Sequence, residues 1–544
     1  MINAEQLAKM MQHSEQDYLY LFLLAALGCW FLYLAWRSQR LRAAMLRLNI
    51  PLPRLGISAI LLLGAVVRIP RIFDSLWYDE TFTARVAGVP LSQLPAAIMG
   101  DVHPPLWYSF EWLWTKLAGN SEFALRLPSL LLGVLLIWLV YRLALALGMI
   151  EQVALVAALI VAILQAPAYY SVEARGYALL ACLAITMMIA IRKNRPTLFA
   201  VCGVAICWTH NLGYFYLLVL GMYASLFWNH RYFVIYRSEL KKEIVVQQPG
   251  IDWVNWFQWL IIPGAIASLW LPFALQQSKV IADGFWIQPF TMGMGVRLIT
   301  DMTVGRQLPP ELAPIFYFLI FLLTLVSLIV ARRWLATVNG LQWLALVVGV
   351  PAAVAVASIV WHPVYLTRAM LPCGVALSIL WAYLLVHAPA RGLARLVAVP
   401  VLFGALISFY SPLSGGREDI RAYFAPCAGV TAVYSTSIPA SMFDSYYIDA
   451  PLINWPDAGD LNQTLTPASK EAYGLVPGSI DDLRGDVCLL ALDTPVTTDA
   501  ERAQVASIAA KYSHTVTTFV AGPLYRIHVY RFTIGENHAN ANTS

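Results

Sequence analysis

Charged residues are what this sequence most lacks. Asp, Glu, Lys and Arg make up 12% of its 544 residues, whereas hydrophobic residues make up 59%. An ordinary soluble domain carries about 25% charged residues, so these charges are too few to cover a soluble globule of this length. The same balance excludes a disordered chain, a coiled coil and a collagen-like chain. The formal charge of +5 points to no nucleic-acid partner, because Lys and Arg lie in short joints between apolar segments.

Long apolar runs are present instead. They recur at lengths of about 18–22 residues, which is what a helix needs to cross a bilayer core of about 30 Å. We therefore expect a polytopic all-α membrane protein with about 12 transmembrane helices. The expected spans are residues 17–36, 55–73, 127–147, 152–170, 176–191, 197–210, 212–228, 253–275, 314–331, 341–361, 369–388 and 396–410.

Basic residues set the expected orientation. They accumulate in alternate joints, and such joints remain on the cytoplasmic side. The joint after the first span is the richest, and the opposite joints, which carry acids, are expected outside together with both termini. The first apolar run is followed by arginines and is read as a retained span, not a signal peptide. The basic joints contain Arg37, Arg40, Arg42, Arg47 and Arg54; Arg142; Arg192, Lys193 and Arg195; Arg231, Arg237, Lys241 and Lys242; Arg332 and Arg333; Arg391 and Arg395.

Residues 197–228 alone fit either one long span or two short ones. Basic joints flank this stretch on both sides, so the chain must return to the face it left. Two short helices that turn near His210 satisfy this condition. At 1.5 Å per residue each is barely long enough to cross, so the turn is expected below the outer surface, inside the protein.

The composition changes after about residue 411. Short segments with β-branched residues alternate with a segment of helical period. We expect residues 1–410 to form the transmembrane domain and residues 411–544 an α/β domain on the outer face. Cys427 and Cys488 lie in this domain; they pair if the compartment is oxidising and the geometry permits, which sequence does not reveal.

The first outer loop, residues 74–126, is long and carries adjacent acids. Tyr78, Asp79 and Glu80 directly follow a span, at the depth of the lipid head groups that aromatic residues prefer. A carboxylate at that depth can act on a substrate presented from the lipid. The same acids, with Thr83, also fit a structural role at a helix N-terminus.

Four further sites on the outer side carry polar residues. Asp101 and His103 precede two prolines, which fix an extended segment, so His103 either binds a phosphate or hydroxyl or only shapes the loop. Arg175 lies among tyrosines before Tyr177, and either binds an anion or pairs with Glu173. Arg368 follows Tyr365 and either faces the bundle interior or extends to the surface. His210 stands in the short-helix turn.

The shared location of these groups supports a chemical role. The orientation was set by the basic joints alone, yet the acids, arginines and histidines all fall on the outer side. A carboxylate can take the proton of an acceptor hydroxyl, an effect of roughly 10²–10⁴-fold, while cations stabilise a departing phosphate. This combination fits displacement at a phosphate-linked carbon.

In these residues the chain resembles the GT-C superfamily of membrane glycosyltransferases. It is most similar to the bacterial branch of protein O-mannosyltransferases, lipid A aminoarabinose transferase and lipopolysaccharide galacturonosyltransferases. No single motif is specific, and it is the ordered set that gives fairly strong support to the resemblance. The matching segments are Asp79-Glu80, His103-Pro104-Pro105-Leu106-Trp107-Tyr108, Gly119-Asn120-Ser121-Glu122, Leu125-Arg126-Leu127-Pro128-Ser129, Glu173-Ala174-Arg175-Gly176-Tyr177, His210, Arg368 before Leu371-Pro372, and Glu418-Asp419-Ile420-Arg421-Ala422-Tyr423.

The resemblance implies transfer of a sugar, with inversion, from a polyprenyl-phosphate donor to a lipid, glycan or protein acceptor on the outer face of a bacterial inner membrane. Asp79 would be the general base, and Glu80 would orient the acceptor or support Asp79. Arg175, Arg368 and His103 would contact the donor phosphate. Tyr78, Asp101, Tyr177, His210 and Tyr365 would surround the pocket. The family's Arg-Tyr pair is Arg368-Ala369 here, so that tyrosine's role is absent or taken by Tyr365.

No cofactor is expected; a divalent metal is not favoured, although the sequence leaves metal dependence open. The resemblance implies that members with a monophosphate donor need no metal, whereas relatives similar to oligosaccharyltransferase need acidic ligands. Asp101 and Asp301 are the spare outer acids, and Arg126 is read as structural.

Two other functions compete with sugar transfer. Twelve spans also suit a transporter or lipid flippase, although such proteins place polar groups near the bilayer midplane. Alternatively, the membrane part is an anchor and the domain after residue 411 is a binding module.

Overall fold

The computed structural model describes residues 4–227, 253–281, 287–305, 308–309, 311–411, 421–435, 446–448, 450, 452–454, 467–472, 476–477, 485–493, 499–522 and 525–534. Two expected features lie outside the described residues: the basic joint at 231–242, and residues 418–420 of the motif that follows the last expected span.

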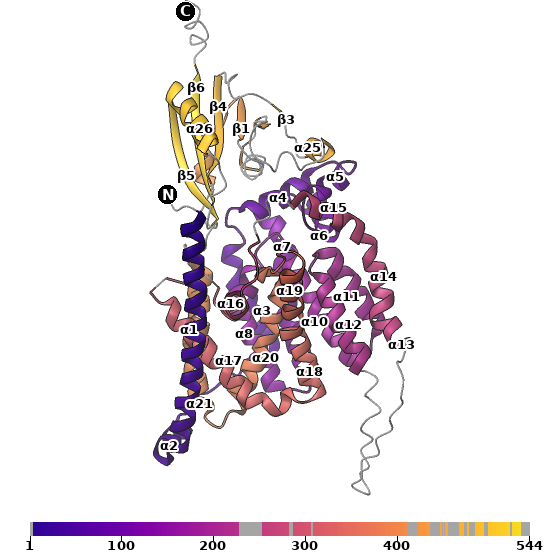
Figure 1. Cartoon of the computed structure of the whole chain (residues 1–544), viewed down its shortest axis with the longest axis vertical. Coiled ribbons are helices and arrows are strands. Elements are labelled where there is room, and N and C mark those ends of the chain that lie inside the picture. Colours follow the sequence, from indigo (N-terminus) through magenta and orange to yellow (C-terminus); the bar gives the residue numbers. More distant parts are fainter. Residues whose placement is uncertain are drawn as a thin grey trace, which may run out of the picture.

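A bundle of apolar helices makes up the larger part of the molecule (Figure 1). Within the described ranges, seven helices are long and apolar enough to cross a membrane, and three shorter apolar helices lie among them. The protein is therefore a multi-pass membrane protein, while the number twelve stays a prediction. The long segments are Asp17–Arg37, Glu122–Ala146, Phe257–Gln277, Ala313–Leu335, Val338–Val360, Thr367–His387 and Arg391–Tyr410; the shorter ones are Glu151–Ile163, Pro196–Thr209 and Gly213–Leu226.

The helices of the bundle follow the expected apolar runs closely. Several long segments are interrupted by π or 3₁₀ turns, as in the π turns Phe257–Ile261 and Ala345–Gly349. The α-helices are α1 Ala4–Arg37, α2 Gln39–Arg47, α3 Ile57–Arg68, α7 Glu122–Ala146, α8 Glu151–Ile163, α9 Gln165–Tyr169, α10 Tyr177–Lys193, α11 Pro196–Thr209, α12 Gly213–Phe227, α13 Trp253–Trp256, α14 Ile262–Ala267, α15 Leu271–Ile281, α16 Met292–Asp301, α17 Ala313–Leu335, α18 Val338–Leu344, α19 Val350–Val360, α20 Leu371–His387 and α21 Arg391–Tyr410.

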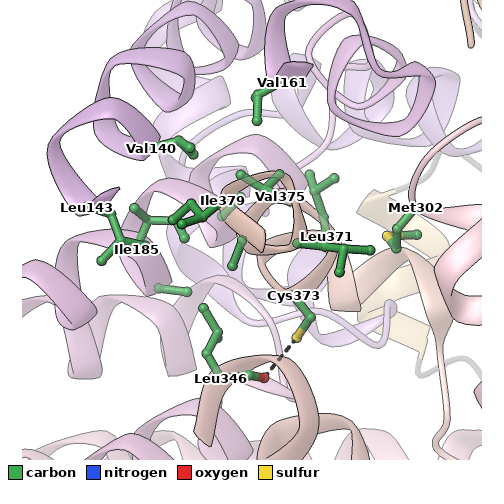
Figure 2. Close-up of a cluster of buried hydrophobic side chains, with 14 of the residues drawn as sticks. Val140, Leu143, Val161, Ile185, Met302, Leu346, Leu371, Cys373, Val375 and Ile379 are labelled. Carbon is green, nitrogen blue, oxygen red and sulfur yellow. Dashed lines mark hydrogen bonds between the residues drawn. The ribbon is translucent and has the colours of Figure 1, made fainter. Parts of the chain in front are cut away.

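Helix α20 forms the centre of the bundle. It is apolar all round, and 94% of its membrane-length window is buried, as expected for a helix enclosed by others. Val375 and Ile379 of α20 pack toward α7 and α10 in Figure 2, and the Cys373 thiol donates to the Leu346 carbonyl at 3.3 Å. The side chains drawn there form a packed apolar core.

The stretch 197–228 forms two short helices, α11 and α12, with a turn at residues 210–212. A glycine is required where the second helix starts, because a Cβ on Gly213 would lie 2.3 Å from the Ile206 carbonyl oxygen. This close approach holds His210 in the turn. The prediction of two short helices is thus confirmed.

The first long loop folds into three helices at one end of the bundle. They are α4 Tyr78–Gly88, α5 Leu94–Met99 and α6 Pro105–Ala118, and they lie between the bundle and the C-terminal sheet in Figure 1. Phe82, Val86, Ile98, Trp107 and Trp270 belong to one buried cluster. The cluster fixes the loop helices to each other and to the segment that leads into α15.

The C-terminal part contains a mixed six-stranded sheet of order β3-β2-β1-β4-β6-β5. Strands β3, β2, β1 and β4 pair in parallel, and β4, β6 and β5 pair antiparallel. Cys427 and Cys488 form a disulfide with a Cα–Cα distance of 5.8 Å, so the two cysteines do pair. The elements are α22 Arg421–Phe424, β1 Ala432–Ser435, β2 Leu452–Asn454, α25 Pro467–Ala472, β3 Val476–Pro477, β4 Gly485–Asp493, α26 Asp499–Lys511, β5 His514–Gly522 and β6 Tyr525–Ile534.

Candidate active site

Asp79 lies in the first turn of α4 and reaches an arginine nearly 290 residues away. Its Oδ2 accepts a hydrogen bond from Arg368 Nη1 at 2.7 Å, and these two side chains keep 13% and 17% of their surface exposed. Arg368 lies in the 3₁₀ turn Thr367–Met370 before α20. Its guanidinium stands 5.3 Å from the Tyr177 ring centroid. Arg368 therefore faces the protein interior.

Arg175 joins the same group from the short segment before α10. Its Nη1 donates to Tyr108 Oη at 2.6 Å, and the Tyr108 hydroxyl in turn donates to Asp101 Oδ2. Arg175 Nη1 also reaches the Asp79 carbonyl oxygen at 3.5 Å. The carboxylate of Asp101 and the guanidinium of Arg175 are thus bridged by one phenol.

His103 closes this network. Its Nδ1 is 2.9 Å from Asp101 Oδ2, while Arg175 Nη2 lies 3.1 Å from Nδ1 and 3.3 Å from Nε2. A carboxylate only accepts and a guanidinium only donates. The tautomer that satisfies both partners carries the proton on Nδ1 and leaves Nε2 as acceptor.

His210 brings an unused donor to the site. Its Nδ1 accepts from the Leu212 backbone N–H at 3.1 Å, which puts the ring proton on Nε2. The Nε2 atom is buried and has no hydrogen-bond partner among the described residues. The ring lies edge-on to His103, with 5.2 Å between centroids.

These side chains line a very small cavity. Its volume is about 10 Å³, room for about one water molecule. His103, Tyr108, Arg175, Tyr177 and His210 are in its wall. Asp79 and Arg368 are not among its lining residues; they are linked to the cavity through Arg175, which reaches the Asp79 carbonyl, and through the Tyr177 ring beside Arg368. A larger group enters only if the lining side chains move apart.

Burial and charge shift the titration of the loop residues in different directions. Burial raises the pKa of Asp79, but the charges of Arg368 and Arg175 outweigh it and hold the pKa below its ordinary value. Burial likewise opposes ionisation of Asp101, whose pKa His103 and Arg175 hold far below its usual range. Burial lowers the pKa of His103 against the opposing charge of Asp101. Two ionised carboxylates and a neutral imidazole result at neutral pH.

Glu80 points away from this cavity although it adjoins Asp79. It is fully buried and its two oxygens accept from Arg126 Nε and Nη2, both at 2.6 Å. Glu80 Oε1 also accepts from the Ala174 backbone N–H at 2.8 Å. Arg126 donates further to the Ser75 carbonyl at 2.8 Å. Both Glu80 oxygens are therefore engaged inside the protein, and neither faces the cavity.

Two other expected pocket residues, Tyr78 and Tyr365, are not among the residues that line the cavity. Tyr365 is buried with its ring 4.7 Å from that of Phe290, so Tyr177, not Tyr365, supplies the aromatic face over Arg368. Tyr78 packs against two apolar clusters, one in the loop helices and one in the C-terminal part.

Three residues that support the site were not expected from sequence. Tyr108 bridges Arg175 and Asp101. Gln277 Nε2 donates to the His103 carbonyl at 3.3 Å, and Asn211 Nδ2 donates to the Val102 carbonyl at 2.8 Å. The position of Tyr108 next to the His-Pro-Pro motif was a usable signal, since it lies in the first turn of α6, which begins at Pro105. The sequence around Gln277 gave no such signal, because nothing in that segment indicates a contact with the first loop.

No group of three His, Cys, Asp or Glu side chains able to hold a metal ion is found in the ranges that the structure covers. Asp101 and Asp301, the spare acids, lie on different elements: Asp101 binds His103, and Asp301 is 3.5 Å from Arg297 within α16.

Comparison with known proteins adds to this geometry. Residues 102–246 match the family model of dolichyl-phosphate-mannose-protein mannosyltransferase. The fold is similar to that of ArnT from Cupriavidus metallidurans, crystallised with undecaprenyl phosphate, with a TM-score of 0.50 and 14% identity over 87% of this chain and 97% of ArnT. The resemblance to the GT-C superfamily is thereby confirmed. No curated protein is detectably similar in sequence.

A second solved structure aligns more loosely. The oligosaccharyltransferase of Archaeoglobus fulgidus, in complex with Zn and sulfate, aligns with a TM-score of 0.44 and 12% identity, over 86% of this chain and 72% of that chain.

Proposed function

We propose that this protein is an inverting glycosyltransferase that moves a sugar from a polyprenyl-phosphate donor to an acceptor on the outer face of the membrane. One observation carries the proposal. Asp79, His103, Arg175 and Arg368 come from four separate segments and meet in one buried group, in which Asp79 is bonded to Arg368. A carboxylate beside two guanidiniums is the set that displacement of a phosphate-linked sugar requires.

The arginines and histidines are suited to the donor phosphate. Arginine binds phosphate oxygens through paired N–H donors, and Arg175 and Arg368 flank Asp79. The Nε2–H of His210, without a partner among the residues described, is a further buried donor at the same cavity. When the Arg368 guanidinium leaves Asp79 and binds the donor phosphate, the cavity opens and the Asp79 carboxylate faces the acceptor.

The reaction then needs one base and one stabilised leaving group. The acceptor hydroxyl oxygen attacks the anomeric carbon, the bond from that carbon to the phosphate oxygen breaks, and polyprenyl phosphate leaves with the electron pair. Asp79 takes the hydroxyl proton. Arg175 and Arg368 stabilise the phosphate as its charge grows. Once Arg368 leaves Asp79, the pKa of that carboxyl rises, which makes Asp79 a better base.

The known proteins support the choice of donor. Undecaprenyl phosphate is bound in the ArnT structure, and the matched family model is described by a dolichyl-phosphate sugar. The acceptor is a lipid, a glycan or a protein of the cell envelope, as the resemblance to lipopolysaccharide-modifying enzymes suggests. A transporter is less well supported, because the candidate groups gather at one end of the bundle while its centre is a packed apolar core (Figure 2).

The test is an Asp79→Asn variant of the full-length protein. Amide cannot take the proton, so transfer of sugar from the lipid-phosphate donor should fall at least about 10²-fold with donor binding retained. Glu151→Gln, at the start of α8 and remote from the site, is the matched control. Transfer by Asp79→Asn at the rate of the control would exclude Asp79 as the base.

A further inference from the structure

A second and larger cavity lies where the C-terminal part meets the first loop. Its volume is about 450 Å³, within the range of small-ligand sites, about 300–1,000 Å³. The loop contributes Asn120 and Glu122, and the C-terminal part contributes Arg421, Phe424, Tyr446 and Tyr447. The mechanism proposed above uses none of these residues.

Aromatic rings form one wall of this cavity, and they are held rigidly. Phe424 and Tyr447 stack with 5.5 Å between centroids and 4° between planes, and Tyr446 meets Tyr447 edge-on at 5.0 Å. Tyr446 Oη donates to the Asn120 carbonyl at 2.9 Å. Rigid aromatic walls with few rotamers to fix lose little entropy when a ligand binds.

The charges in the lining balance. Arg421 Nε and Glu122 Oε1 form an ion pair at 3.0 Å, so the cavity wall offers hydrogen-bonding groups without net charge. A phosphate or another anion would have to compete with Glu122. Aromatic faces with a rim of planar donors and acceptors suit a neutral ring that has apolar C–H faces and hydroxyl edges, as a pyranose does.

The cavity adjoins the chain segments that position Asp79. Tyr447 Oη accepts from the Leu76 N–H at 2.5 Å and donates to the Leu76 carbonyl at 3.3 Å, three residues before Asp79. On the other side, Glu122 opens α7, the helix whose Arg126 holds Glu80. A ligand in this cavity therefore rests on the elements that position the base.

We propose that this cavity binds a sugar residue of the acceptor, a neutral carbohydrate ring stacked on Tyr446 and hydrogen-bonded by the Glu122–Arg421 pair. The proposal rests on the proposed function and adds that the acceptor carries carbohydrate next to the hydroxyl that is modified. A peptide acceptor, which needs extended backbone contacts, is the competing occupant.

The first experiment measures binding without catalysis. Saturation-transfer NMR on the full-length protein uses N,N′-diacetylchitobiose as the carbohydrate probe and a Ser/Thr-containing hexapeptide as the peptide probe. We expect the disaccharide signal to persist in Tyr446→Phe and Asp79→Asn and to drop at least about fivefold in Tyr446→Leu, which lacks the stacking face. Tyr512→Leu, directly after α26 in the same part of the chain, is the matched control and should keep the signal.

A second variant keeps the test decisive if Tyr446→Leu does not fold. Ala428 is exposed in the cavity wall, so Ala428→Trp fills the cavity without disturbing buried residues and should also abolish the disaccharide signal. In transfer assays both variants should raise KM for the acceptor about fivefold to tenfold, with KM for the donor unchanged. A disaccharide signal that is absent or survives both changes, or one given by the hexapeptide instead, overturns the proposal. The Asp79→Asn variant tests the base and does not test the cavity. Failure of the carbohydrate-site proposal can therefore be distinguished from failure of the proposed function.

Discussion

Asp79 and Glu80 are neighbours in sequence but face different sides of α4. Asp79 faces the arginines of the cavity, whereas Glu80 is sealed against Arg126 with no exposed surface on either side chain. One helical position rotates a side chain by about 100°, and that rotation separates the two roles. The acidic pair is thus one candidate base and one buried anchor.

The buried Glu80–Arg126 pair predicts a large loss of stability when one of its charges is removed. Breaking a buried ion pair on one side costs about 3–5 kcal/mol, because a charge is left without its partner. Glu80→Gln should therefore lower the unfolding free energy by about 3 kcal/mol and weaken transfer through disorder of α4. Asp493→Asn, in a half-exposed pair with Arg502, is the control and should cost little. Equal melting curves for the two variants would contradict the anchor role.

Glu111 on α6 predicts a pH dependence. The side chain is fully buried, and neither carboxyl oxygen has a hydrogen-bond partner within the described ranges. Burial, followed by the charge of Glu80, raises the pKa of Glu111 from 4.5 to about 8. The folded protein therefore holds this proton where the unfolded chain has lost it.

The direction of the pH dependence follows from this difference in proton binding between the folded and the unfolded chain. Below pH 4.5 both states are protonated and the full stability is present; it falls as pH rises toward 8, by on the order of 4 kcal/mol. Glu111→Gln should remove this fall. Its melting temperature should match that of the wild type near pH 5 and exceed it near pH 8.5. Parallel melting curves across that range would show that Glu111 does not titrate there.

At the residue scale, sequence could find the charged members of the site but not their partners. Asp79, Arg175 and Arg368 were predicted because charges are rare in this chain and these fall in the outer joints. Gln277 and Asn211 act through hydrogen bonds to backbone carbonyls, Gln277 to those of Ile98 and His103 and Asn211 to that of Val102. Such bonds depend on chain segments that only the fold brings together.

At the scale of elements, the length of an apolar run predicted the helices of the bundle well, whereas the sequence of the first loop did not predict its three helices. Helices such as α17 and α21 begin and end within a few residues of the expected spans, since burial in lipid demands a continuous apolar run. The three helices of the first loop were not separated beforehand, because their cluster of Phe82, Ile98 and Trp107 is assembled by packing from different turns and has no fixed period.

The disulfide predicts how the C-terminal elements hold together. It joins the 3₁₀ turn Ala425–Cys427 to β4 across a sequence separation of 61 residues. Closing a loop of that length in the unfolded chain is worth about 4 kcal/mol in the chain-entropy account. Replacing both Cys427 and Cys488 by Ser should lower the stability of the sheet by about that amount, measured by limited proteolysis in increasing urea.

The control for this prediction is a free cysteine. Cys29→Ser, in the half-buried part of α1, changes a thiol without opening a bridge and should leave the proteolysis midpoint in place. A reducing agent should reproduce the double variant in the wild type and have no further effect on it. Resistance of the wild-type sheet to both treatments would show that the bridge adds no stability.

At the scale of the whole molecule, the basic residues and the candidate site lie at opposite ends. Helix α1 runs the length of the bundle, from the end near the sheet to α2 (Figure 1), and α2 carries Arg40, Arg42 and Arg47. The site and the C-terminal sheet lie at the other end, joined by Arg421 to Glu122 and Ser469 to Ala96. The orientation proposed from the basic joints would therefore put the candidate site and the C-terminal sheet together on the outer side.

That orientation can be tested with two single cysteines. Gln39 begins α2 and Ala118 ends α6, and both are exposed. A membrane-impermeant maleimide added to intact cells with a permeabilised outer membrane should label Ala118→Cys and spare Gln39→Cys until the inner membrane is lysed. Basic residues resist translocation, and the polyprenyl-phosphate sugar is expected on the side that receives the label. The reverse pattern would put Asp79 in the cytoplasm, where the acceptor hydroxyl would have to belong to a cytoplasmic molecule and the proposed envelope acceptor would be excluded.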